Sequence, residues 1–230
     1  MAATVGAVVG ASALGSKPTH HAGNPSSSGA AGQPSGEAAG QTGLLASAAN
    51  AYQSDYRQFE GVFSAPNQAV GNASADITKQ NERLQNDETT IDDGGGDASC
   101  DPSDFTSYES CLTQAEQTVS NAESDVNAAT AAEHNDVAQE QTADGEIVTA
   151  LSTFVQQLDG ITWPSVAETD AANLTQALSD ERDAYSQGAA DLADDQDVTA
   201  DNNAITTTGS AVTTQEINLA TALQIPPPSS

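Results

Sequence analysis

The chain has 230 residues, of which 33 are acidic and 5 are basic, and its formal net charge is −28 at pH 7. So negative a protein repels phosphate backbones and anionic lipid headgroups, so we expect neither nucleic-acid binding nor charge-driven membrane attachment. The expected partners are another surface protein or a neutral or basic polymer. Leu, Ile, Val and Phe account for only 36 residues, about 16% of the chain. So low a share of large apolar residues, combined with a high net charge, is typical of disorder unless those residues recur at a regular spacing.

The N-terminal segment, residues 1–15, is a short apolar run with the sequence MAATVGAVVGASALG. Its length fits the core of a signal peptide and is too short for a membrane span. No Lys or Arg precedes Lys17, so the basic start of such a peptide is missing. The segment is either a truncated signal or a flexible tail, and we expect a secreted or cell-envelope, extracytoplasmic protein.

Residues 16–40 are rich in Ser, Gly, Ala and Pro and carry no apolar period, which is typical of a flexible tether. His20 and His21 lie in this stretch, where an adjacent histidine pair indicates a solvated linker rather than a metal site. At the other end, residues 226–230 form a Pro-rich tail that stops the last helix.

Between these ends, residues 41–225 show apolar side chains at alternating steps of three and four, the period of an amphipathic helix. The pattern predicts three helices, over about residues 43–91, 103–159 and 164–223. Narrow seams joined by short connections are typical of coiled-coil packing, and the abundant alanines favour close approach of helices. The sequence therefore predicts an all-α fold, an elongated antiparallel three-helix bundle, with four helices as the alternative.

Four residues mark places where these helices are expected to weaken. Pro66 lies inside the first seam, and we expect it to kink or divide the first helix. The glycines are expected breaks because glycine lowers helix stability; they are Gly145, Gly188 and Gly209.

The two cysteines, Cys100 and Cys111, flank the start of the second helix. A close, even pair in an exported chain predicts one disulfide, whereas two free thiols would be expected in a cytosolic protein. No further Cys or His lies at ligand spacing, which argues against zinc.

A polar layer is expected midway along the bundle, where the seam of the second helix loses its apolar residues. Hairpins that turn near residues 98 and 163 would bring aromatic, acidic and basic side chains of all three helices to one level. We call this predicted set the polar waist: Tyr52, Tyr56, Arg57, His134, Glu140, Asp144, Glu181, Arg182 and Tyr185. It is either a small-ligand or partner contact, or a structural layer that fixes helix register; the second interpretation is favoured because charges beside a seam are usually its solvated flanks.

Calcium is the metal for which the sequence offers a weak candidate. Asp92, Asp93 and Asp97 surround a run of three glycines, and a Gly-rich turn can fold carboxylate oxygens around one ion. A solvated acidic turn explains the same residues. We therefore predict no metal site and no cofactor.

Catalysis finds no support in the sequence. The chain has three histidines, two of them in the tether, and shows neither a nucleophile elbow, a P-loop, a zincin helix nor a dinucleotide fingerprint. No nucleophile, base and orienting group stand together, so we expect a protein that is not an enzyme.

The segment that joins the second and third predicted helices resembles a known group of proteins. It reads FVQQLDGITWPSVAETDAANLTQAL, with an aliphatic-x-Trp-Pro turn followed by a helix with an early Asp and spaced leucines. This resembles a group of uncharacterised exported helical proteins of actinobacteria, at Ile161, Trp163, Pro164, Val166, Asp170, Leu174 and Leu178. The resemblance implies an extracytoplasmic helical bundle and transfers no catalytic residue.

Together these observations predict a non-enzymatic secreted or cell-surface helical bundle with a structural or protein-interaction role. The alternative is an extracytoplasmic protein that binds a small ligand or a cation such as calcium, at the polar waist or the acidic loop.

Overall fold

The computed structural model describes residues 36–101, 103, 105–194 and 198–227. These residues form four α-helices and one short 3-10 helix, namely α1 (Gly36–Asp92), η1 (Gly94–Ser99), α2 (Phe105–Asp159), α3 (Glu168–Ala193) and α4 (Thr199–Ala222). No strand occurs in these ranges, so the predicted all-α bundle is confirmed. The apolar segment 1–15 and the histidine pair of the tether lie outside the described residues.

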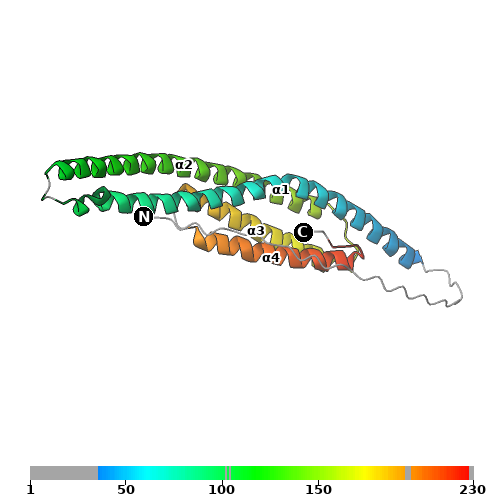
Figure 1. The fold of residues 1–230 in the computed structure, drawn as a ribbon. Coiled ribbons are helices and arrows are strands. Elements are labelled where there is room, and N and C mark those ends of the chain that lie inside the picture. Colours follow the sequence, from blue (N-terminus) through cyan, green and yellow to red (C-terminus); the bar gives the residue numbers. More distant parts are fainter. Residues whose placement is uncertain (1–35, 102, 104, 195–197, 228–230) are drawn as a thin grey trace, which may run out of the picture.

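Two long helices and two short ones give the molecule two parts. α1 and α2 run antiparallel as a long hairpin, and α3 and α4 form a shorter hairpin beside part of it (Figure 1). Leu192 and Val198, where α3 gives way to α4, pack with Ile77 and Val137 of the long hairpin. We call the part in which all four helices lie together the base. The part that extends past this contact consists of α1 and α2 alone, residues 78–136, and we call it the arm.

The base holds the main core. Aromatic rings from α1 and α2 pack together there; Phe59 and Phe154 stack with their centroids 4.6 Å apart. The indole N–H of Trp163 donates a hydrogen bond of 3.2 Å to the carbonyl oxygen of Leu158. The fully buried leucines complete this core from α2, α3 and α4: Leu151, Leu158, Leu174, Leu178 and Leu219.

The third predicted helix, over residues 164–223, is in fact two helices, so the alternative of four helices is the one observed. α3 begins at Glu168 rather than at Pro164, whose carbonyl oxygen accepts from the N–H groups of Ala167 and Glu168. α3 ends at Ala193, in a run of aspartates that combine mutual repulsion with low helix propensity.

The expected breaks at the three glycines and the expected division of the first helix at Pro66 are wrong. α1 is a single helix through Pro66, and its ribbon is bent along its length (Figure 1). The three glycines lie inside α2, α3 and α4. At the N-terminal end, α1 starts at Gly36, so residues 36–40 belong to a helix and not to the predicted tether.

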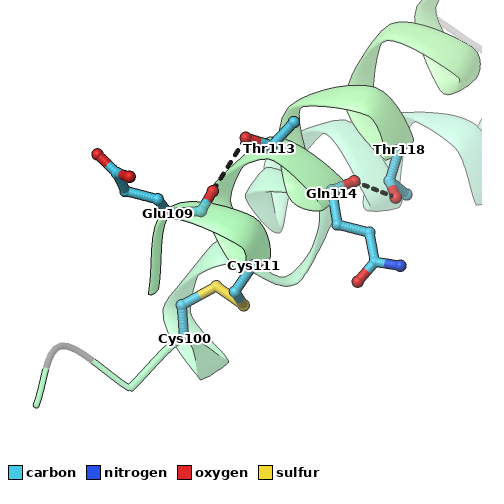
Figure 2. Close-up of a disulfide and its surroundings, with 6 residues drawn as sticks. All are labelled: Cys100, Glu109, Cys111, Thr113, Gln114 and Thr118. Carbon is cyan, nitrogen blue, oxygen red and sulfur yellow. Dashed lines mark hydrogen bonds between the residues drawn. A yellow bond between two sulfur atoms is a disulfide. The ribbon is translucent and has the colours of Figure 1, made fainter. Parts of the chain in front are cut away.

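The end of the arm is closed by a turn that folds back onto α2. Gly94, Gly95 and Gly96 all have positive φ, a conformation that favours glycine. A Cβ at Gly95 would collide with the backbone carbonyl of Ala115, so this turn lies directly against α2. The predicted disulfide is present: Cys100 is joined to Cys111 in α2, with 5.7 Å between their Cα atoms (Figure 2).

This returning turn changes the register of the long hairpin. The hydroxyl of Ser74 donates a hydrogen bond to Glu140, and the side-chain amide N–H of Gln157 donates one to Oε1 of Gln58. The indices of facing residues therefore sum to about 214 instead of the expected 196. η1 packs against the first turns of α2. The end of α1 therefore lies beside the middle of the α2 segment of the arm rather than beside the start of α2. The predicted level of the polar waist on α1 is therefore wrong.

Candidate functional site

A cavity of about 370 Å³ lies where the four helices of the base meet below the arm. α1 contributes Asn67 and Val70, and α2 contributes Glu140 and Asp144. The short helices and the residues between them complete its wall with Tyr185, Gly188, Leu192, Val198, Asn202 and Ile205. We call this space the acidic cavity, because its two carboxylates are its charged lining groups.

Glu140 is placed in the cavity by its position one helical turn from Asp144 on the buried face of α2. The residue is 3% exposed. The hydroxyl of Ser74 on α1 donates a hydrogen bond of 3.1 Å to Oε1 of Glu140, while Oε2 has no hydrogen-bond partner. Burial raises the pKa of this carboxyl to about 7, against the opposing effect of the Ser74 hydrogen bond.

Asp144 repeats this arrangement without the hydroxyl. It is also 3% exposed, and its Oδ1 has no hydrogen-bond partner. Burial raises the pKa of Asp144 to about 7, and the neighbouring charge of Glu140 adds to the shift. Two buried acceptors side by side are costly unless a donor reaches them.

Glu181 and Glu216 form a second acidic group deeper in the base, on α3 and α4. Burial raises the pKa of Glu181 to about 7. Burial also raises the pKa of the partly exposed Glu216 to about 7, with Glu181 and then Glu60 adding repulsion. Tyr185 lies between the groups: burial raises the pKa of its phenol above the usual range, and the charges of Glu181 and Asp144 add to this.

No basic side chain of the described part lies among these carboxylates. Arg57 and Lys79 are exposed, and so is Arg83. Arg182 is one-third exposed at its side chain and pairs with its neighbour Asp183 at 2.6 Å. The predicted waist therefore lacks the buried cation that would have made it an ion-paired layer.

The structure brings some members of the predicted waist together and separates others. Glu140, Asp144 and Tyr185 line one cavity, and Glu181 lies near enough to Tyr185 for its charge to act on it. Tyr52 and Tyr56 instead pack on Phe154, far along α2 from Glu140. His134 is exposed on the arm.

Several residues of the site were not predicted from the sequence. Ser74 is fully buried although it stands beside the seam rather than on it. Gly188 and Gly209, expected to break their helices, instead allow close packing. A Cβ at Gly188 would lie 3.5 Å from Cβ of Asp201, and one at Gly209 would lie 3.3 Å from Oε1 of Glu181. A buried glycine at seam spacing was the available indication of close helix approach.

The weak calcium candidate gains no support. Asp92 and Asp93 are exposed, and the side chain of Asp97 lies outside the described residues. Among the side chains that the structure describes, no group of three or more His, Cys, Asp and Glu is placed to hold a metal ion.

A second hollow, of about 540 Å³, lies between α1 and α2 on the base. Phe59, Val62 and Pro66 give it an apolar wall, and Glu146 is its one carboxylate. Nothing in the structure shows what covers it.

No helix of the described part is long and apolar enough to cross a membrane. No protein-family model, curated protein or solved structure matches the chain.

Proposed function

We propose that the chain is a non-enzymatic secreted or cell-surface protein whose four-helix base holds a two-helix arm out for contact with a basic partner protein. The single observation that carries this proposal is the arm itself. It extends beyond α3 and α4 and ends in a disulfide-closed turn (Figures 1 and 2). A protruding helical hairpin adds no core to the base, which favours a role in contact rather than in folding.

Charge indicates the chemistry of the partner. The arm offsets its acids only with the exposed Lys79 and Arg83. Its exposed acidic residues are Glu82, Glu88, Asp92, Asp93, Asp101, Glu109, Glu116, Glu123 and Asp125. Complementary charge guides association, so a lysine- or arginine-rich surface fits the arm.

Export is supported by the cysteine pair. Both cysteines of the chain are used in the disulfide, and disulfides persist in oxidising compartments outside the cytosol. The resemblance to exported helical proteins and the apolar first segment support the same localisation.

Charge-neutralising variants test the arm. A lysine-rich peptide serves as the probe, and its affinity for the full chain is measured by biolayer interferometry at low and moderate salt. Replacing Glu82, Glu116 and Glu123 by Gln is expected to weaken binding about tenfold and to reduce its salt dependence, because three favourable surface charges are lost.

The matched control removes three exposed charges from the base, with Glu146→Gln, Asp159→Asn and Glu168→Gln. We expect it to bind nearly as the unmodified chain does. Equal losses in both variants would mean that net charge alone attracts the peptide, and the arm would then have no special role.

A second candidate function, binding of a small ligand or cation inside the base, is favoured by one specific observation. Glu140 and Asp144, each of which has one unpartnered carboxylate oxygen, line a cavity large enough for a small molecule. A thermal-shift screen of the full chain against small cations tests it, with a rise of several degrees in melting temperature as the supporting result.

A further inference from the structure

We propose that the acidic cavity binds a small organic cation: a primary aliphatic amine whose ammonium group lies between Glu140 and Asp144 and whose short carbon chain lies against the apolar wall. This inference rests on the second candidate function and names its ligand class.

Glu140 and Asp144 each bury a carboxylate oxygen that no donor reaches. Oε2 of Glu140 and Oδ1 of Asp144 have no hydrogen-bond partner, and both residues are 3% exposed. Buried polar atoms in folded proteins are nearly always hydrogen-bonded, so each exception calls for a donor that the chain itself does not provide. The two residues stand four apart on α2, a spacing that places them on one helix face.

No lysine or arginine of the described residues neutralises these two carboxylates. The lysine and arginine residues of the described part lie at the surface, where Lys79 pairs with Asp76 at 2.6 Å and Arg182 pairs with Asp183. Two further buried acids, Glu181 and Asp201, add negative charge to the interior rather than offset it. Two carboxylates in such a place therefore attract a positive group from solution.

The size and the partly apolar wall of the cavity suit a small organic molecule. Its volume, about 370 Å³, is in the range of small-molecule sites. Val70, Leu192, Val198 and Ile205 give one side an apolar surface, to which a hydrated metal ion gains nothing by binding. Calcium takes six to eight oxygen ligands, and no group of three acidic or histidine side chains is placed to hold a metal among the described residues.

A primary ammonium meets these conditions better. Its three N–H donors can satisfy both free carboxylate oxygens and one further acceptor. The phenol of Tyr185, which lines the same space, already donates a hydrogen bond of 3.3 Å to Oδ1 of Asn67, and its oxygen remains able to accept. The carbon chain of the amine then lies against the four aliphatic side chains.

Isothermal titration calorimetry on the full chain at about pH 8, where the carboxyl groups are charged, tests the inference. The probes are butylamine and 1,4-diaminobutane, with 1-butanol as the neutral analogue and calcium chloride as the inorganic cation. Both amines are expected to bind, and the alcohol is not. Glu140→Gln and Asp144→Asn are each expected to weaken amine binding by about tenfold or more, since each removes one charge-assisted hydrogen bond.

Glu146→Gln is the matched control, because Glu146 is an exposed acid two residues after Asp144 on the same helix. Its affinity for amines is expected to be unchanged. Should a cavity variant lose its helical circular dichroism, methyl NMR of the unmodified chain replaces it: butylamine must shift the methyl signals of Val198 and Ile205, and butanol must not.

The outcomes separate the inference from the function on which it rests. Calcium binding without amine binding overturns the organic cation and leaves cation binding in place. No binding by any probe overturns both. Amine binding that Glu146→Gln weakens as much as Glu140→Gln does also overturns the assignment to this cavity.

Discussion

At the scale of single residues, the unusual feature of this protein is carboxyl groups buried without a cation. Glu140, Asp144 and Glu181 are less than a tenth exposed, and their pKa values are raised to about 7 by burial. Burying a charged acid is costly, so these groups favour the protonated form in the folded state. Protons therefore bind more tightly to the folded chain than to the unfolded one.

The buried carboxyl groups are expected to make the folded chain more stable in acid than at alkaline pH. An unfolded Asp or Glu has a pKa near 4, and the folded values are about 7. The added stability is fully present below about pH 4 and is lost as the pH rises through about 7. We expect the melting temperature, measured without amines, to be several degrees higher near pH 5 than near pH 8.

A variant isolates one of these groups. Glu140→Gln is a neutral mimic of the protonated side chain and is expected to remove roughly 3 kcal/mol of the pH-dependent free energy of unfolding, at about 1.4 kcal/mol per pKa unit. The exposed Glu146→Gln is the control and should leave the slope unchanged. Urea unfolding at several pH values measures the free energy of unfolding of both variants. A melting temperature that stays constant or falls as the pH is lowered would contradict the prediction.

At the scale of the helices, base and arm differ in what they bury. Large side chains that are almost fully buried, such as Phe154, Leu174 and Leu219, belong to the base. The arm packs mainly through small residues, among them Ala115, Ala122 and Ala129. Because stability scales with buried apolar area, the arm is held less strongly than the base.

Hydrogen exchange should show this difference. Amide protons of the arm, in peptides covering residues 110–130, are expected to exchange at least about tenfold faster than those of the base in residues 145–158, since local opening of the arm exposes less apolar surface. Mass spectrometry of peptic fragments measures both in one experiment. Equal protection in the two regions would mean that base and arm open as one unit.

The helix pattern was predictable from the sequence, and the register was not. The seam through Ile147, Leu151 and Phe154 has the right period and is buried, as expected. The predicted pairing of α1 with α2 is wrong because it assumes a symmetric hairpin about residue 98. In the structure, the turn between the two helices packs back onto α2. Local spacing fixes which face of a helix is buried, but the offset between two helices depends on the whole connection.

The same reason explains why the candidate site was only partly predictable. The sequence predicts a common level for Glu140, Asp144 and Tyr185, which line one cavity, because that level depends only on the pairing of α2 with α3. The predicted level of Tyr52 and Arg57 depends on the pairing of α1 with α2, which differs from the expected one. Ser74 could not be predicted for the same reason, since its contact with Glu140 depends on that pairing.

At the scale of the whole molecule, the net charge of −28 is the dominant property. With the described basic residues all at the surface, repulsion among the acids opposes the compact state, and salt screens that repulsion. We expect the melting temperature to rise by several degrees between low and moderate sodium chloride. Potassium chloride should act equally if screening is the cause; no rise with either salt would contradict the prediction.

The position of the disulfide has a consequence for the continuity of the chain. Cys100 and Cys111 enclose only the short stretch between η1 and the second turn of α2. A single peptide-bond cut within that stretch would divide the protein into one piece with α1 and another with the other three helices, yet the two would remain one covalent molecule. A cut at the end of the arm therefore leaves the base assembled. The two pieces lose their covalent link only when a reductant breaks the disulfide.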